Sequence, residues 1–202
     1  SGKDMRKQAV ISVNIAVLLF GLAGLFAKWI GLPAICITFG RVVFSSAALG
    51  LYLLLRRQSV RIARKTDFLL LLAAGGVLVL HWWSFLESIQ LATVAVGTIT
   101  FSSFPLFVTF LEPVIFRQRL EKNNVAAAVM ILIGVLITIP EFSLENHMFL
   151  GIVTGMVSAL SYAVLTIMNK YMTGRISSTV TAFYEQAAAA VILLPFVLKE
   201  RA

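Results

Sequence analysis

The sequence predicts an all-α integral membrane protein, a polytopic bundle of helices that cross the bilayer. Its 202 residues are 59% hydrophobic and only 13% charged, and their mean hydropathy is +0.94. A soluble domain carries about 25% charged residues, so this chain has roughly half the usual charge. The charged residues lie in short clusters between long apolar runs. A bilayer solvates so much apolar surface directly, whereas a single soluble core could not bury it.

Seven apolar runs are long enough to cross a bilayer, since a spanning helix needs about 20 residues. We predict spans at residues 9–30, 34–55, 67–90, 93–116, 123–140, 148–171 and 178–198. Gly31 and Pro33 separate the first two, because glycine and proline end and start helices. The third and fourth spans are joined tightly near Ala92. Residues 1–8 are expected to be a cytoplasmic N-terminus that begins with a cloning scar.

Basic residues gather in alternate loops, and this pattern predicts the orientation. They precede the first span or follow the second, fourth and sixth, as Lys3, Arg6, Lys7, Arg56, Arg57, Arg61, Arg64, Lys65, Arg117, Arg119, Lys122, Lys170 and Arg175. Cytoplasmic loops are enriched in Lys and Arg, so we expect a cytoplasmic N-terminus, in a bacterial inner membrane. The same rule explains the net charge of +8. A nucleic-acid partner is therefore not expected, because nucleic-acid binding needs a basic face on a soluble domain.

Two parts of the sequence can be aligned with each other. Residues 19–30 align with residues 161–172, and in the next span Arg41 aligns with Glu185. Runs of small residues follow both positions. Apolar helices align easily by chance, so the evidence for a repeat is the matching order of these polar and small residues. The alignment predicts an internal repeat.

The first unit of this repeat, residues 9–140, holds five spans. An odd number makes the second unit, residues 148–202, enter the membrane from the opposite side, as in the inverted repeats of secondary transporters. Only two of the five spans expected of the second unit are present. We therefore expect a truncated or partial chain with about seven transmembrane helices, where a complete member has ten.

Several motifs carry a family resemblance. Residues 39–44 place an arginine near the start of the second span, and residues 89–97, 104–107 and 111–113 join the third span to a fourth that contains prolines. With these motifs the sequence resembles the drug/metabolite transporter superfamily, and within it the EamA-type permeases. The resemblance implies a ten-helix bundle with a central cavity, both termini cytoplasmic, and a proline that breaks the fourth helix.

The fourth span carries a polar stripe that could line a cavity. Its members, spaced three or four residues apart on one helical face, are Thr98, Ser102, Pro105, Thr109 and Glu112. Pro105 cannot donate a backbone hydrogen bond and frees a carbonyl one turn earlier, so we predict a hinge there. The alternative interpretation is helix–helix packing, in which Ser and Thr are frequent.

The third span contains His81, Trp82, Trp83 and Glu87. We predict that His81 and Trp83 face the cavity, and that Glu87 beside Trp83 could hold an amine by charge and cation–π attraction. If transport is coupled to protons, His81 and Glu87 are the expected carriers. For Trp82 we favour an aromatic belt at the membrane interface.

Four further residues complete the candidate substrate site. Arg41 carries a charge that costs about 2.5–3.5 kcal/mol in the middle of a spanning helix, and Glu185 occupies the equivalent repeat position. The alternative is that both side chains reach the interface. Asn14 and Tyr162 lie on polar stripes of the first and sixth spans and are also candidate ligand contacts.

No enzyme motif appears in the sequence. The chain has two histidines, 66 residues apart, one cysteine and no P-loop, so we expect no metal, no cofactor and no direct use of ATP. We predict a secondary transporter, an exporter of small organic metabolites such as amino acids, amines or drug-like compounds, working by alternating access. A coupling proton and a second copy are its candidate partners. The alternative is a truncated, non-transporting membrane fragment or an assembly unit that needs a partner chain.

Overall fold

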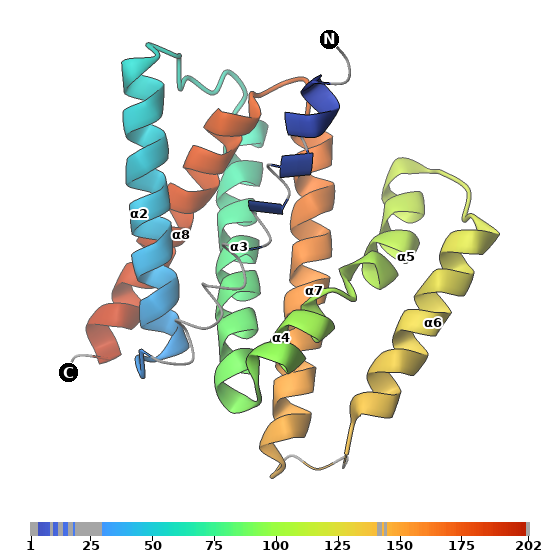
Figure 1. Cartoon of the computed structure of the whole chain (residues 1–202). Coiled ribbons are helices and arrows are strands. Elements are labelled where there is room, and N and C mark those ends of the chain that lie inside the picture. The colour runs from blue at the N-terminus through green and yellow to red at the C-terminus, as the bar shows by residue number, and fades with distance from the viewer. Residues whose placement is uncertain are drawn as a thin grey trace.

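The computed structural model describes residues 4–8, 10–11, 14–15, 18, 30–140, 143 and 145–200. Helices and their connecting loops make up this part of the chain (Figure 1). The helices whose first and last residues are both described are α2 (Ala34–Leu55), α3 (Lys65–Leu91), α4 (Val94–Phe101), α5 (Phe104–Phe116), α6 (Lys122–Thr138), α7 (His147–Met172) and α8 (Ser178–Glu200). Most of the predicted first span, residues 9–30, lies outside the described residues.

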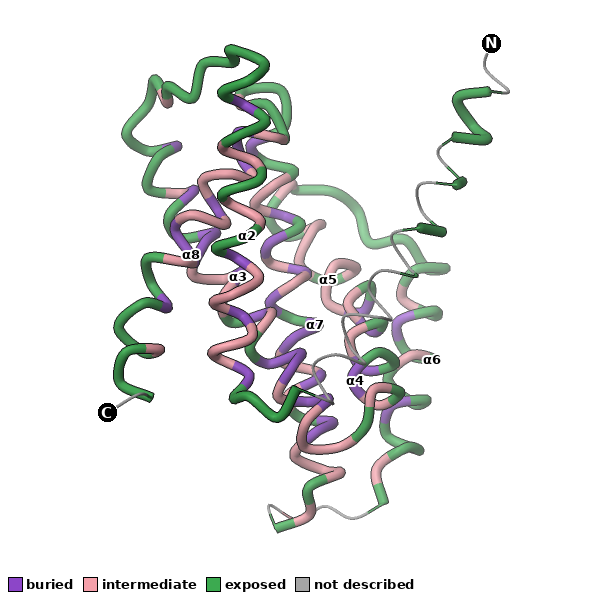
Figure 2. The backbone as a smooth tube through the Cα atoms, turned by 60° about the vertical axis from the view of Figure 1, so that its left-hand side comes forward, coloured by how far each residue is buried: buried purple, intermediate pink, exposed green. Residues whose placement is uncertain are grey.

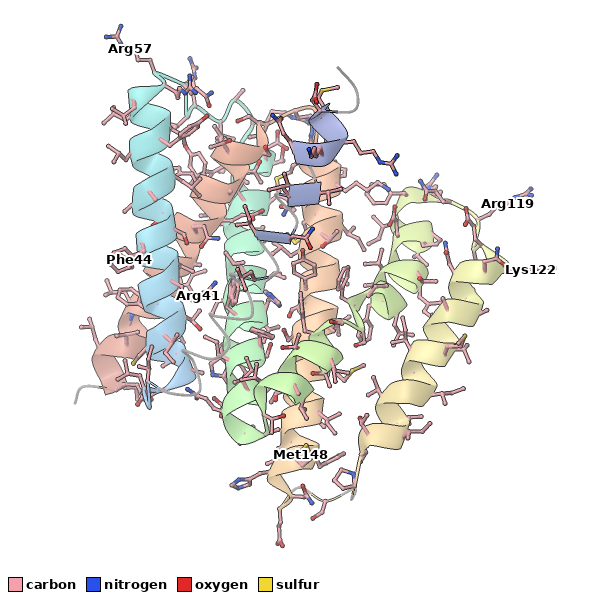
Figure 3. The ribbon with its side chains drawn as sticks, viewed as in Figure 1. Arg41, Phe44, Arg57, Arg119, Lys122 and Met148 are labelled. Atoms are coloured by element: carbon pink, nitrogen blue, oxygen red, sulfur yellow. The ribbon has the colours of Figure 1, made fainter. Side chains whose placement is uncertain are left out.

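The lengths of these helices confirm a polytopic membrane helix bundle. Among the described residues, α2, α3, α7, α8 and the combined stretch Val94–Phe116 are long and apolar enough to cross a bilayer. The apolar helix α6 is shorter, with 17 residues. Large apolar side chains point outward, and Phe44 on α2 is 80% exposed (Figure 3). Lipid can solvate such side chains, whereas water would not.

The fourth predicted span consists of two helices. α4 ends at Phe101 and α5 begins at Phe104, with Ser102 and Ser103 between them. Pro105 occupies the first turn of α5. Backbone N–H groups in a first turn have no intrahelical partner, so the missing N–H of proline costs no hydrogen bond there. The interruption therefore lies just before the proline. Whether the two halves move about it, as the predicted hinge requires, remains a prediction.

Helix α3 lies at the centre of the bundle. It packs along α7 and also contacts α2, α4 and α8, while α2 packs on α8 and α6 contacts α5 at the edge (Figures 1 and 2). Small residues allow the closest approaches. A Cβ added to Gly75 of α3 would lie 2.6 Å from Ala188 Cβ of α8, and one added to Gly155 of α7 would lie 1.9 Å from Thr100 Oγ1 of α4. Small residues serve the same purpose at many transmembrane helix contacts.

Candidate functional site

His81 lies on α3 where that helix packs against α7, and its side chain is fully buried. Its Nδ1 is 3.1 Å from the backbone carbonyl oxygen of Ser158 and 3.0 Å from Ser158 Oγ. Because a carbonyl can only accept, the Nδ1–H donates to it, and Nε2 of the neutral imidazole then carries a lone pair. This Nε2 is buried and has no hydrogen-bond partner among the described residues.

Aromatic rings surround the imidazole. The ring centroids of Trp82, Phe101 and Tyr162 lie 5.2, 5.2 and 5.1 Å from that of His81. Phe85 stacks at 6.3 Å from His81, and Phe104 contacts Tyr162 at 4.9 Å. We call these six residues the aromatic cluster. Its members come from α3, α4, α5 and α7, so the cluster spans the interruption between α4 and α5.

Arg41 connects the aromatic cluster with a cleft. Its guanidinium carbon lies 4.0 Å from the centre of the Trp82 ring, a cation–π contact. Arg41 also lines a cleft of about 490 Å³ along α2, together with Leu32, Ile37 and Phe44. Figure 3 labels Arg41 and Phe44 on this helix. Within the described part of the chain no carboxylate pairs with Arg41. The arrangement suits an anionic group that enters the cleft.

The two neighbouring tryptophans lie in different surroundings. Trp82, which we expected in an interfacial belt, belongs to the aromatic cluster. Trp83 is 38% exposed and lines a separate apolar cleft of about 230 Å³ with Leu193 and Phe196 of α8. Glu87, one turn beyond Trp83, is half-buried. The structure therefore does not bring Trp83 together with His81.

The polar stripe of the fourth span is directed mostly at its own backbone. The exposed hydroxyls of Thr98 and Ser102 donate to the carbonyls of Val94 and Thr98, each at 2.7 Å. Pro105 is exposed and, with Thr109 and Glu112, lines a cleft of about 380 Å³ between α5 and α6. These contacts do not place Thr98 or Ser102 in the aromatic cluster.

The remaining candidates lie elsewhere. Asn14 is exposed and its side-chain amide donates to the carbonyl of Val10 at 2.8 Å. Glu185 is buried on α8 and its backbone carbonyl lies beside Gly75 of α3. Arg41 lies over Trp82, seven residues further along α3, which corresponds to about 10 Å. Arg41 and Glu185, the two candidates at equivalent repeat positions, therefore lie at different levels along α3.

Sequence reasoning missed Trp82, Phe85, Phe101 and Phe104. Phenylalanine within a spanning helix carries no signal that separates an interior contact from a lipid-facing one. For Trp82 the adjacent polar His81 was a signal, since buried polar side chains usually face the bundle interior.

These features define a class of protein: a polytopic membrane protein whose interrupted helix and aromatic cluster lie beside a membrane-embedded arginine. The model of the EamA-like transporter family matches residues 7–139. The chain belongs to this family.

Curated relatives agree with the assignment. The chain is 26% identical over 196 residues to an uncharacterized transporter of Bacillus subtilis named YxxF, a match that covers 95% of the chain and 63% of the relative. It is 27% identical over 187 residues to an uncharacterized transporter of Archaeoglobus fulgidus, covering 93% of the chain and 65% of the relative. The chain thus spans less than two thirds of the length of these relatives. No solved structure matches it significantly.

Proposed function

We propose that the protein is a secondary-active transporter that exports small organic metabolites by alternating access between inverted repeats. Family membership supports a transport function. The choice of solute is based on Arg41, which contacts Trp82 and lines an open cleft. Among the predicted classes, amino acids fit best. A carboxylate would pair with Arg41, while an apolar side chain would pack against Ile37 and Phe44, which line the same cleft.

Arg41 lies within a helix that is long and apolar enough to span the membrane. A charge there is costly, and such charges usually pair with another group or face a solute pathway. Arg41 contacts the ring of Trp82 and also lines a cleft. A carboxylate would gain a charge-assisted, bidentate hydrogen bond with the guanidinium, stronger than one between neutral groups. Amines carry no carboxylate that could offset the repulsion between their ammonium group and Arg41, so we place them second.

The arrangement of the loops supports the proposed orientation. The α2–α3, α5–α6 and α7–α8 loops, which carry the described basic loop residues, lie at one end of the bundle (Figure 1). Arg57, Arg119 and Lys122 mark that end, and Met148 marks the other (Figure 3). By the positive-inside rule the end with these cations is cytoplasmic, in a bacterial inner membrane. The packing of α2 on α8, the second helix of each unit, supports the proposed inverted repeat.

Solute binding can be measured with tryptophan fluorescence, because one of the three tryptophans lies in the site. Substituting phenylalanine for Trp29 and Trp83 leaves Trp82 as the only reporter. We expect amino acids with apolar side chains to change its emission saturably. Arg41→Ala should weaken their affinity at least about 10-fold, since a hydrogen bond to a charged group contributes about 1.5–3 kcal/mol. Arg57→Ala, which removes an exposed cation near the end of α2, is the matched control.

Transport itself is tested in proteoliposomes with labelled amino acids, amines and nucleosides. The 202-residue chain should be compared with a version extended to the length of its relatives. Flux that Arg41→Ala abolishes and Arg57→Ala preserves supports the proposal. Binding without flux in either form would favour the alternative of a non-transporting assembly unit. No fluorescence change with any amino acid would refute the proposed solute class.

A further inference from the structure

A cleft between α7 and α8 contains a buried carboxylate that the proposed solute site does not use. The cleft has a volume of about 450 Å³ and is lined by Asn169 of α7, residues 173–177 of the connecting loop, and Thr181 and Glu185 of α8. Glu185 is only 5% exposed. It lies seven residues from the start of α8, about 10 Å along the helix. The cleft therefore leads from the end of the bundle to a carboxylate about one third of the way into a span.

Two buried oxygen atoms in this cleft lack hydrogen-bond donors. They are Glu185 Oε1 and Asn169 Oδ1, and neither has a partner among the described residues. Leaving a buried acceptor unpaired is unfavourable, and more so when it is charged. Both residues line the same cleft, and the side chain of Asn169 hydrogen-bonds to the carboxylate of Glu185, so a single bound species can reach the two free oxygens. That species must supply positive charge or a hydrogen-bond donor.

The arginine that lines the cleft already has a partner. Arg175 lines the cleft, but its Nη2 lies 3.1 Å from Asp67 Oδ1 at the start of α3. Its guanidinium carbon also lies 4.5 Å from the centre of the Tyr171 ring. Asp67 thus balances the charge of Arg175.

The other neighbouring elements bring no free cation to Glu185. Lys170, adjacent to Asn169, forms an ion pair with Glu112 of α5. The segment of α3 that packs on Glu185 presents Gly75, and Arg41 lies about 10 Å further along α3. In the described part of the chain, the carboxylate of Glu185 has no charged partner.

We propose that Glu185 and Asn169 form the binding site of the cation that drives transport, a proton or a sodium ion. A proton on Glu185 Oε1 neutralises the carboxylate and turns this orphan acceptor into a donor. A sodium ion, as a hard cation, would accept both free oxygens as ligands. Intramembrane carboxylates commonly carry protons or coordinate ions in transporters. This inference rests on the proposed transport function and assigns the coupling role to Glu185 in place of His81 and Glu87.

Cation binding can be measured on the purified chain without any flux assay. For sodium, thermal unfolding is followed while choline chloride is replaced by sodium chloride at constant ionic strength. A shift of about 5–10 °C is expected at a sodium concentration ~100 times the dissociation constant. For a proton, infrared difference spectra between acidic and alkaline pH should contain the carbonyl band of a protonated carboxylic acid. Glu185→Gln should remove whichever signal appears, whereas Glu121→Gln, at an exposed acid before α6, should keep it.

Each outcome decides the proposal. A sodium-dependent shift lost in Glu185→Gln identifies sodium, and a carboxylic-acid band lost in that variant identifies a proton. If neither signal differs between the parent and Glu185→Gln, the proposal is overturned. Should Glu185→Gln fail to fold, Asn169→Ala keeps the carboxylate and must still weaken the signal. Since none of these measurements needs solute, cation binding without solute flux would refute the transport function alone.

Discussion

Replacing Gly75 with alanine tests how closely α3 and α8 approach each other. A Cβ at this position would lie 2.6 Å from Ala188 Cβ, 3.1 Å from the backbone oxygen of Glu185 and 3.2 Å from the backbone nitrogen of Ala189. Two of these three atoms belong to the backbone and cannot rotate away. The two helices must therefore separate by several tenths of an ångström or more to admit one methyl group.

The expected cost follows from this geometry. Forcing an extra carbon into a well-packed contact costs about 1–3 kcal/mol. The next residue, Gly76, provides a matched control, because a Cβ there meets only Ile192 Cδ1, at 3.9 Å. Both variants gain the same helix propensity, at most about 1 kcal/mol. Gly75→Ala should therefore be less stable than Gly76→Ala by about 1–3 kcal/mol.

Unfolding in mixed micelles, titrated with a denaturing detergent and followed by circular dichroism, measures this difference. Gly75→Ala should unfold at a lower detergent fraction than the parent, and Gly76→Ala at the same fraction or a higher one. Equal midpoints for the two variants would refute the close contact. They would also remove the basis for placing Glu185 in a confined cleft, since its backbone lies at this contact.

Two further substitutions test contacts that join distant parts of the chain. Ser158→Ala removes the hydroxyl that contacts His81 Nδ1 at 3.0 Å. It should lower the unfolding free energy by about 0.6 kcal/mol, the average for such interhelical bonds in a membrane protein, and by no more than about 1.7 kcal/mol. An unchanged midpoint would exclude that bond. Tyr184→Phe removes the hydroxyl that donates to the carbonyl of Val60 at 2.5 Å. Trypsin should then cleave the basic α2–α3 loop about 2–10 times faster, as expected for the loss of about 0.5–1.5 kcal/mol, and an unchanged rate would contradict the contact.

Hydropathy predicted the helices well because each must match the bilayer. The second span, predicted as 34–55, coincides with α2, and the predicted junction near Ala92 lies between the end of α3 and the start of α4. The interruption at Ser102–Ser103 was foreseen only as a proline hinge. Its exact position depends on local contacts, such as the bond from Ser103 Oγ to the carbonyl of Thr100, which a hydropathy pattern does not contain.

The candidate site was only partly predictable. His81 and Tyr162 were both chosen from the sequence, and their rings lie 5.1 Å apart. The sequence did not show that Trp82 joins the aromatic cluster while Trp83 lines a separate cleft. Adjacent residues on a helix point about 100° apart, and only tertiary packing decides which of them faces inward. The separation of Arg41 from Glu185 likewise depends on how α2 and α8 lie along α3.

Helix α3 connects the two proposed sites. At one level it contributes His81 and Trp82 to the aromatic cluster, and about 10 Å away it contacts the backbone of Glu185 through Gly75. A helix is stiff over two turns, so a shift of α3 against α8 that changes the cation cleft also moves the aromatic rings beside Arg41. The close contact at Gly75 leaves no layer of side chains between α3 and α8 to absorb such a shift. The proposed coupling between cation and solute would therefore require no relay of polar residues between the sites, only two positions of α3 that each ligand prefers to a different degree.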